Sequence, residues 1–342
     1  MASVAEADSV SDRGNVSDVV GMAVLGACAA WALITAAAHD GRPEGVLLAV
    51  LAVTAGYAWG RITGTLLPVA APCAGALTGL GLAVSLPQFA PGPQFTTPLG
   101  DVGATAALLT LATGAACCAA WAATAPAVRV ALRALAAGIV ATAAAMGSTA
   151  GCALGATVLL CSLAAGRMRR RGPGIVSLAL ATVLVAGACW VIAAHALPDG
   201  LALPLEDRLT PRRVQLWHDA LHSVAAAPEL GVGPGRFGEL GSAAPQALLH
   251  DGKPHSAPLQ QAAEQGLIGL VLLAGAYCWV LYALWRTPRP TPIALTTGAA
   301  LTALAAIATV GNALSFTTVS VGAGVLAGLA TARPLTGDLP ER

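Results

Sequence analysis

Long apolar runs separated by short polar connections cover most of the chain. Ten runs can be distinguished, and many approach the twenty or so residues that a helix needs to cross the hydrocarbon core of a bilayer. The pattern predicts an all-α fold, a polytopic membrane helix bundle of about ten transmembrane helices, with nine to eleven as the expected range. The runs cover residues 19–38, 45–59, 66–86, 104–123, 130–146, 152–165, 175–197, 266–285, 293–310 and 314–330.

Composition favours a membrane protein over a soluble globule. Hydrophobic residues make up 56% of the 342 residues and charged residues only 10%. Alanine and glycine dominate many of the runs, and such small residues let membrane helices pack closely. The formal net charge of +1 gives no indication of nucleic acid as a partner. The lipid bilayer is therefore the expected surrounding of the chain.

The cysteines and the aromatic residues of the runs are interpreted structurally. All eight cysteines lie inside apolar runs, which argues against a disulfide framework or a thiolate metal site. Trp59, Tyr282 and Trp285 are interpreted as anchors at the membrane–water interface.

Arginines occupy every second connection between the runs. Cytoplasmic connections of membrane proteins carry an excess of arginine and lysine. The connections with arginine, together with both chain ends, are therefore predicted to be cytoplasmic, and the long loop 198–265 is predicted to lie outside. Nucleic-acid binding is the less favoured interpretation of the run 167–171. The arginines concerned are Arg61, Arg129, Arg133, Arg167, Arg169, Arg170, Arg171, Arg286 and Arg289.

The chain is predicted to form a single membrane domain over residues 19–332. Residues 1–18 contain four acidic residues and lack the basic start of a signal peptide, so they are predicted to be a short disordered cytoplasmic tail. Residues 333–342 are predicted to be a second cytoplasmic tail. Pro68 and Pro72 are expected to kink or unwind the third apolar run.

Loop 198–265 is the one long polar interval and is predicted to hold the active site. Thr210 and Pro211 are typical of a helix start, since threonine caps free amides and proline loses no hydrogen bond in the first turn. Apolar residues then recur at spacings of three and four, with polar residues on another face. This pattern predicts an amphipathic helix of about four turns on the membrane surface. The apolar face consists of Val214, Trp217, Leu221 and Val224, and the polar face consists of Arg212, Gln215, Asp219 and His222.

A glycine-rich segment, Gly-Val-Gly-Pro-Gly at residues 231–235, follows this helix. Glycine lets backbone amides approach a ligand closely, so Gly233 and Gly235 are candidates for binding an anion. For so short a motif taken alone, an ordinary loop is the favoured interpretation.

His255 precedes a second predicted helix start, in which Ser256 can cap and Pro258 can occupy the first turn. The positive end of a helix dipole disfavours a protonated imidazole. His255 is therefore expected to stay neutral, as a general base must. Glu264 lies at the water-facing end of this helix, just before the apolar run that begins at Gly266.

Four motifs follow one another in this region. They are Arg-x-x-x-Trp at 213–217, Pro-Glu-Leu-Gly-Val-Gly-Pro-Gly-Arg-Phe at 228–237, His-Ser at 255–256 and Leu-Gln-Gln-Ala-Ala-Glu-Gln-Gly-Leu-Ile-Gly at 259–269. In order and spacing they resemble the signature of the O-antigen ligase and O-antigen polymerase family. The resemblance covers about 60 residues.

This resemblance implies a polytopic, GT-C-like membrane enzyme that needs no metal and no cofactor. The expected reaction moves a glycan from an undecaprenyl-pyrophosphate carrier to a hydroxyl of a glycan, lipid or protein acceptor, outside the bacterial cytoplasmic membrane. In that family an arginine and a histidine at the positions of Arg213 and His255 are needed for activity. Many members also carry an arginine in a turn between two middle helices. Here that turn is Gly147-Ser-Thr-Ala-Gly151, so one charge of the expected donor site is missing.

Glycosyl transfer from a lipid pyrophosphate needs cations for the departing pyrophosphate and a base for the incoming hydroxyl. Arginine suits the first role because its fork binds phosphate oxygens in pairs, so Arg213 is the first candidate, and His255 is the candidate base. Structural roles are favoured for Trp217, as the anchor of the surface helix, and for Glu264. The other loop histidines are interpreted as solvent-exposed residues. The supporting substrate-binding candidates are Arg212, Arg236, Gly233, Gly235, Trp217 and Glu264, and the other histidines are His218, His222 and His250.

Several alternatives stay open. Ligases and polymerases differ in their acceptor, which the sequence does not identify. A related peptidoglycan polymerase would carry an aspartate directly after the histidine, where this chain has Ser256. A transporter or flippase of lipid-linked sugars would place paired charges inside its helices, which are nearly free of charge here. A noncatalytic family member is consistent with the missing arginine of the middle turn.

Overall fold

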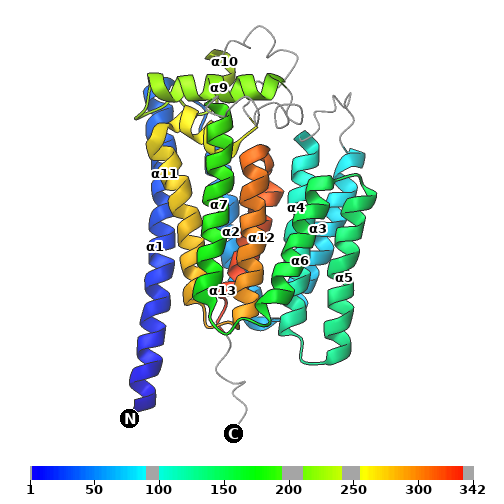
Figure 1. The fold of residues 1–342 in the computed structure, drawn as a ribbon. Helices are drawn as coiled ribbons and strands as arrows, with labels where there is room; N and C mark the ends of the chain where they lie inside the picture. The colour runs from blue at the N-terminus through cyan, green and yellow to red at the C-terminus, as the bar shows by residue number, and fades with distance from the viewer. Residues whose placement is uncertain (1, 90–99, 195–210, 241–254, 334–342) are drawn as a thin grey trace.

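The computed structural model describes residues 2–89, 100–194, 211–240 and 255–333, and this part of the chain is all-α, as predicted. Most helices run side by side, and α9 lies across one end of the bundle (Figure 1). We call this end the α9 end and the other the opposite end. The elements are α1 (Ala2–His39), α2 (Glu44–Leu66), α3 (Ala70–Phe89), α4 (Gly100–Ala122), α5 (Pro126–Ala145), α6 (Thr149–Ala165), α7 (Arg171–Ala193), α9 (Pro211–Ala226), α10 (Phe237–Leu240), α11 (Ala257–Arg286), α12 (Thr291–Val310), the 3-10 turn η2 (Ala313–Ser315) and α13 (Thr317–Thr331).

The length and composition of the helices fit a membrane. Among the described residues, seven helices are long and apolar enough to cross a bilayer, and three further apolar helices are shorter. The ten predicted apolar runs correspond to these helices, so the chain is a polytopic membrane helical protein. The long ones are Ser17–His39, Glu44–Leu66, Gly103–Ala122, Pro126–Ala145, Arg171–Ala193, Ala257–Arg286 and Thr291–Val310, and the shorter ones are Ala70–Ser85, Thr149–Ala165 and Thr317–Thr331.

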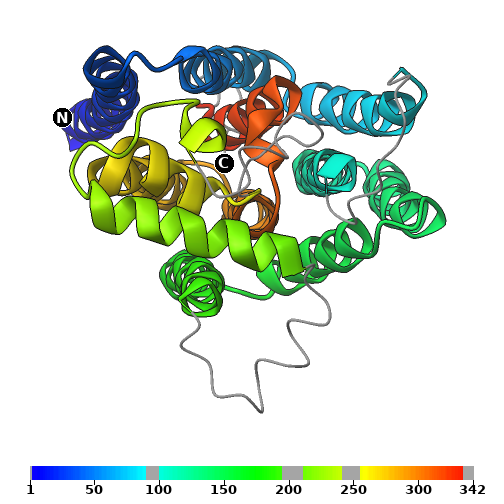
Figure 2. The ribbon, with the colours of Figure 1, turned by 90° about the horizontal axis from the view of Figure 1, so that it is seen from above.

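Helix α4 lies at the centre of the bundle, and its residues 103–120 are all buried. It packs against α3, α5, α6, α12 and α13, which surround it when the bundle is viewed along its axis (Figure 2). Two of its threonines bond back to their own helix, Thr110 to the carbonyl of Ala106 at 2.7 Å and Thr113 to that of Leu109 at 2.8 Å. Because α4 is apolar on every side, neighbouring helices can pack against its whole surface, and α4 therefore forms the core of the bundle.

Helices α2 and α13 approach each other through glycines. Gly56, Gly60 and Gly64 of α2 are buried, and a Cβ added at Gly60 would lie 2.2 Å from the carbonyl oxygen of Val325. On the other helix, a Cβ added at Gly328 would lie 2.2 Å from the carbonyl oxygen of Tyr57. Small residues at a helix interface allow backbones to approach this closely.

An apolar groove of about 510 Å³ is lined by α2, α3, α4 and α13. Trp59 of α2, Leu82 of α3 and Val321 of α13 are among its exposed lining residues. Its walls are apolar, as expected for a surface that faces lipid hydrocarbon.

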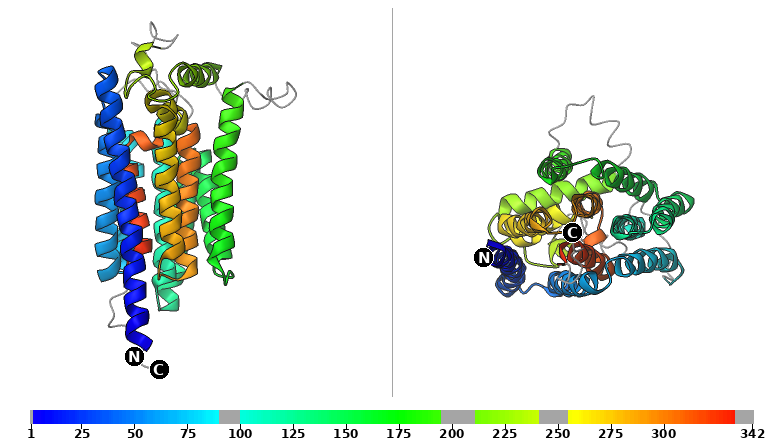
Figure 3. Two further views of the ribbon diagram at one scale, coloured as in Figure 1. Left: turned by 90° about the vertical axis from the view of Figure 1, so that its left-hand side faces the viewer. Right: turned by 90° about the horizontal axis from the view of Figure 1, so that it is seen from below.

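Two boundaries differ from the prediction. Helix α1 extends back to Ala2 and projects beyond the other helices at the opposite end (Figure 3), whereas residues 1–18 were expected to be disordered. No proline interrupts this stretch, so the helix of the first apolar run can continue into it. The prolines of the third run do not kink one long helix. Pro68 lies in the turn that separates α2 from α3, and Pro72 lies in the first turn of α3, where a helix tolerates proline.

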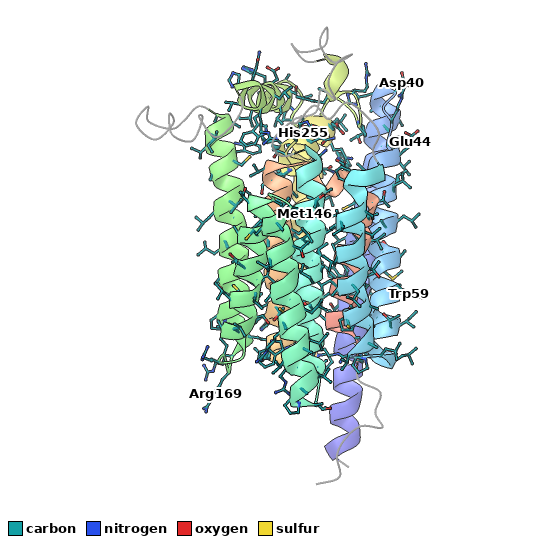
Figure 4. All side chains as sticks on the ribbon, turned by 90° about the vertical axis from the view of Figure 1, so that its right-hand side faces the viewer. Asp40, Glu44, Trp59, Met146, Arg169 and His255 are labelled. Atoms are coloured by element: carbon teal, nitrogen blue, oxygen red, sulfur yellow. The ribbon has the colours of Figure 1, made fainter. Side chains whose placement is uncertain are left out.

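Arginines of separate connections meet at the opposite end, as their alternation predicted. Figure 4 shows Arg169 at this end and His255 at the α9 end. The guanidinium of Arg171 donates to the carbonyls of Thr287 (2.6 Å) and Arg289 (3.0 Å). Arg289, which is buried, donates in turn to the carbonyl of Gly64 (2.6 Å) near the end of α2. The carbonyls of Thr287 and Gly64 lie at the C-terminal ends of α11 and α2, where the helix dipole favours a positive charge.

Candidate active site at the α9 end

Helix α9 is the amphipathic helix that the sequence predicted, and it begins at Pro211 as expected. It lies across the bundle end and packs on α7 and α11 (Figures 1 and 2). Val214, Trp217 and Val224 of its apolar face are buried and Leu221 is partly buried, whereas Gln215 and His222 of the polar face are exposed. The predicted cap Thr210 lies outside the described residues, as does the side chain of Arg212.

Trp217 is the most deeply buried large side chain of α9, with 1% exposed. It belongs to an apolar cluster that joins α9 to α7, α10 and α11 through Cys189, Phe237 and Leu259, among others. This burial favours the interpretation of Trp217 as the anchor of the helix.

Arg213 lies one turn before Trp217 and is also buried, with 6% exposed. Burial lowers the pKa of the Arg213 guanidinium, and an electrostatic interaction with Cys189 of α7 acts in the other direction. An arginine keeps its charge under such conditions. The site therefore contains a positive charge that is largely withdrawn from water.

The start of α11 lies beside the same cysteine. The sulfur of Cys189 is 3.8 Å from the hydroxyl oxygen of Ser256 and 3.5 Å from the carbonyl oxygen of Thr309. Ser256 occupies the N-cap position and Pro258 the first turn, but the serine hydroxyl makes no capping hydrogen bond, contrary to the prediction. It is buried against Cys189 instead.

His255 immediately precedes this cap and is partly buried. Its φ is 48°, a left-handed conformation that is uncommon for residues other than glycine. Such strained conformations cluster at functional sites. Because Cys189 interacts with both Arg213 and Ser256, the structure brings the regions of Arg213 and His255 together at one end of the bundle.

The glycine segment 231–235 packs against α11 rather than standing open. The amide of Val232 donates to the carbonyl of Ala263 (2.9 Å), and that of Gly233 donates to the carbonyl of Glu264 (3.0 Å). Gly231, Gly233 and Gly235 all have positive φ. A Cβ at Gly231 would lie 2.5 Å from the backbone of Glu264, so glycine is required for this close approach.

Glu264 receives hydrogen bonds from both sides of this contact. The amide of Gly235 donates to its Oε2 and the side chain of Gln260 donates to its Oε1, each at 3.0 Å. The carboxylate is buried, with the residue 6% exposed. These contacts agree with the structural role favoured for Glu264.

Helix α11 bends at Gly266, whose φ of 69° and ψ of −172° are not helical. The amide of Leu267 donates to the carbonyl of Pro228 at 2.8 Å. A Cβ at Gly266 would lie 2.3 Å from the carbonyl oxygen of Glu229. The bend thus separates the polar first turns of α11 from its membrane-spanning part.

Arg236 joins the loop to α1, because its guanidinium donates to the carbonyl of His39. Arg42, in the connection that follows α1, donates through its amide to the carbonyl of Pro234 at 2.8 Å. Its side chain is exposed. Arg236 and Arg42 therefore lie in the same part of the α9 end. Arg42 belongs to the connection between α1 and α2, whereas Arg213 belongs to α9.

Sequence reasoning missed three residues of this region. Cys189 looked like one more packing residue of an apolar run. Gln265 is 1% exposed, its Oε1 accepts from Gln261 (2.7 Å), and its Nε2 has no hydrogen-bond partner among the described residues. Arg42 could have been found by its position, since it interrupts the rule that arginines occupy every second connection.

Two other groups lie at this end, a histidine pair on α9 and the turn between α5 and α6. The ring nitrogens Nε2 of His218 and His222 lie 3.0 Å apart, so these two histidines form a pair on α9. In the turn between α5 and α6, Ser148 caps α6 by accepting from the amide of Gly151 (3.2 Å). A serine cap therefore occupies the turn in which the resemblance implied an arginine.

Residues 134–274 match the family model described as O-antigen ligase. The matched range extends from α5 into α11 and includes Arg213, His255 and Glu264. No curated protein and no solved structure matches the chain. The resemblance predicted from the sequence motifs is confirmed over this range.

Proposed function

From the O-antigen ligase domain of residues 134–274, we propose that the chain transfers a glycan from an undecaprenyl-pyrophosphate carrier to a hydroxyl of a glycan, lipid or protein acceptor. One observation carries the proposal. The buried guanidinium of Arg213 on α9 interacts electrostatically with Cys189 of α7. The sulfur of Cys189 lies 3.8 Å from the hydroxyl of Ser256, the residue that follows His255.

In this mechanism the acceptor oxygen attacks the anomeric carbon of the glycan while the bond from that carbon to the pyrophosphate oxygen breaks. The electron pair of the broken bond leaves with the pyrophosphate, which gains negative charge. Arg213 stabilises this charge, and it does so strongly because a buried guanidinium is poorly screened by water. A ring nitrogen of His255 accepts the proton of the attacking hydroxyl.

The remaining candidates support these two residues. Arg236 and Arg212 add positive charge around the donor, and Gly233 and Gly235 shape the loop that faces it. Glu264 holds that loop in place through the amide of Gly235. Trp217 fixes α9, and with it Arg213, on the bundle.

The proposal includes the setting of the reaction. The ten apolar helices support ten membrane crossings, and the arginines at the opposite end support an extracytoplasmic α9 end. A GT-C-like arrangement is what the family resemblance implies. The chain would then lie in the bacterial cytoplasmic membrane with both termini in the cytoplasm. Donor lipid can reach the α9 end from the outer leaflet.

The test is transfer by purified protein in liposomes that contain a lipid-linked oligosaccharide and an acceptor. His255→Ala is expected to lower turnover roughly 100- to 10,000-fold, the usual contribution of general acid–base catalysis. Arg213→Ala is expected to lower it about 10- to 150-fold, since a hydrogen bond to a charged group contributes about 1.5 to 3 kcal/mol.

Matched controls separate these roles from general damage. His222→Ala removes an exposed histidine of α9, and Arg169→Ala removes an exposed arginine of the opposite end, so both should leave turnover unchanged. Wild-type turnover in the His255 or Arg213 variant would remove that residue from the mechanism. No transfer by the wild-type chain with any lipid-linked glycan would instead support a noncatalytic family member.

A further inference from the structure

The first turn of α11 has backbone amides that the described part of the chain does not use. The helix begins at Ala257, and its N-cap residue Ser256 makes no capping hydrogen bond through its side chain. The amide of Gln260 donates to the carbonyl of Ser256 at 2.8 Å. Ahead of it, the amides of Ala257 and Leu259 donate to no described residue, and Pro258 has no amide hydrogen. Free amides at a helix N-terminus attract anions, which the helix dipole also favours.

The hydroxyl that would normally cap this turn is held elsewhere. Ser256 is 1% exposed, and its Oγ lies 3.8 Å from the sulfur of Cys189 on α7. The thiol of Cys189 donates to the carbonyl of Thr309 at 3.5 Å, so its sulfur can only accept from the serine. This contact keeps the serine hydroxyl against α7 and leaves the amides of the first turn free.

Arg213, an independent group beside the same cysteine, lacks a counter-ion. It is 6% exposed, and its guanidinium makes no hydrogen bond and no ion pair within the part of the chain that the structure describes. Its electrostatic interaction with Cys189 supplies no opposite charge, because a buried thiol is neutral at pH 7. A buried charge without a partner is unfavourable. An anion bound by Arg213 and the first turn of α11 would remove this cost.

The position of these groups in the membrane indicates which anion they hold. Arg213 and the N-cap of α11 both lie beside Cys189, which is one turn before the end of the candidate span of α7 at Ala193. Trp217 and Leu259 belong to the same apolar cluster as Cys189. Such a position corresponds to the boundary between hydrocarbon and headgroups, where the phosphates of lipids lie. A lipid-linked phosphate therefore suits this place better than a soluble anion.

We propose that the first turn of α11 is the backbone half of the site for the lipid-linked pyrophosphate. The amides of Ala257 and Leu259 donate to pyrophosphate oxygens, and the fork of Arg213 binds further oxygens of the same group. His255 directly precedes this turn, so the candidate base lies next to the bond that breaks. The inference rests on the proposed function for the identity of the lipid, and it adds the groups that hold it.

Ala257→Pro removes one of these donors without disturbing the helix. Proline is favoured at the first helical position, and Ser256 before it has the extended conformation that proline requires (φ −144°, ψ 113°). Native mass spectrometry of the full chain in a neutral detergent measures binding of undecaprenyl pyrophosphate, the carrier left after transfer. The variant is expected to bind it about tenfold more weakly, the lower range for the loss of a hydrogen bond to a charged group.

Thr317→Pro is the matched control. Thr317 is the first residue of α13, Phe316 before it is also extended (φ −93°, ψ 116°), and its amide donates to no described residue. This variant should keep the wild-type affinity. An equal loss in both variants, or an unchanged affinity in Ala257→Pro, would overturn the proposal.

Two further probes identify the group that is bound. Undecaprenol carries no phosphate and should bind equally to the wild type and to Ala257→Pro. A tenfold loss for undecaprenol as well would overturn the proposal, since the amide would then not act on the pyrophosphate. Inorganic pyrophosphate that binds the wild type as tightly as undecaprenyl pyrophosphate would overturn the assignment to a lipid.

Pro258→Ala tests the same turn in the opposite direction and serves if Ala257→Pro does not fold. Alanine supplies an amide hydrogen at the second helical position, beside the two amides already there. Undecaprenyl pyrophosphate should therefore bind about three- to tenfold more tightly than to the wild type. An unchanged or weaker affinity would count against the site.

Binding and transfer together separate this inference from the proposed function. If Ala257→Pro weakens binding but the wild type transfers no lipid-linked glycan, the pyrophosphate site stands and the reaction fails. If the wild type transfers glycan and Ala257→Pro keeps its affinity, the reaction stands and this site fails.

Discussion

At the scale of single residues, Glu264 connects the two parts of the candidate site. Its two carboxylate oxygens accept from the amide of Gly235 on the loop and from the side chain of Gln260 on α11. A buried carboxylate is stable only when such donors replace water. The same bonds keep the glycine segment 231–235 against the bend of α11.

Glu264→Gln should therefore destabilise the fold without changing the size of the side chain. In the variant, the NH2 group of glutamine replaces one of the two carboxylate oxygens, so either the amide of Gly235 or the side chain of Gln260 loses its acceptor. We expect a loss of about 1 to 3 kcal/mol in the free energy of unfolding. The thermal midpoint in detergent measures this loss. Glu229→Gln, an exposed glutamate of the same loop, is the matched control and should leave the midpoint unchanged. Equal midpoints for the two variants would show that Glu264 does not hold the loop.

Arg213 and His255 could be predicted from the sequence because they lie in motifs with a recognisable order and spacing. Cys189 could not, since a cysteine within an apolar run has the residue type expected of a packing residue. Cys189 belongs to the candidate site only because the end of α7 packs beside Ser256 at the start of α11. That contact between distant parts of the chain is a feature of the tertiary structure. The capping prediction for Ser256 was wrong for the same reason, because its hydroxyl is buried against that cysteine.

At the scale of elements, glycines decide how closely α2 and α13 pack. The carbonyl oxygen of Val325 occupies the space that a side chain at Gly60 would need. Without water between membrane helices, such close van der Waals packing is a main source of association. The interface should therefore be sensitive to a single added methyl group.

Gly60→Ala is expected to destabilise the bundle by about 1 to 3 kcal/mol, because the backbones must move apart to admit the methyl group. The measurement is thermal unfolding in detergent. Gly138→Ala on α5 is the matched control, since a Cβ there meets no atom within 4 Å. If the two variants unfolded at the same temperature, close packing of α2 on α13 would not be what stabilises this pair.

The sequence predicted the existence of the elements better than their ends. Ten apolar runs and the amphipathic helix are found on helices, because hydrophobic length and period are local signals. The start of α1 at Ala2 was missed because acidic composition indicates exposure rather than the absence of a helix. The bend at Gly266 arises from the chain segment 228–229 packing beside it, which a local pattern does not reveal.

At the scale of the whole molecule, the two ends of the bundle have different chemistry. The α9 end carries the buried Arg213, His255 and the glycine segment, and the opposite end carries arginines that bond to backbone carbonyls near helix ends. Positive residues accumulate on the cytoplasmic side of membrane proteins. The molecule is thus expected to face its candidate active site away from the cytoplasm.

This orientation can be tested by labelling single introduced cysteines with a membrane-impermeant maleimide. Gln215→Cys reports on the exposed face of α9 and Arg169→Cys on the opposite end. We expect labelling of Gln215→Cys in intact spheroplasts and of Arg169→Cys only after the membrane is opened. The wild-type chain provides the background, since its eight cysteines all lie within apolar runs.

The reverse labelling pattern would have a wider consequence than the loss of one prediction. An α9 end in the cytoplasm could not receive a lipid-linked glycan from the outer leaflet, so transfer outside the cell by Arg213 and His255 would be excluded. Orientation therefore tests the setting of the proposed reaction independently of the two residues that would perform it.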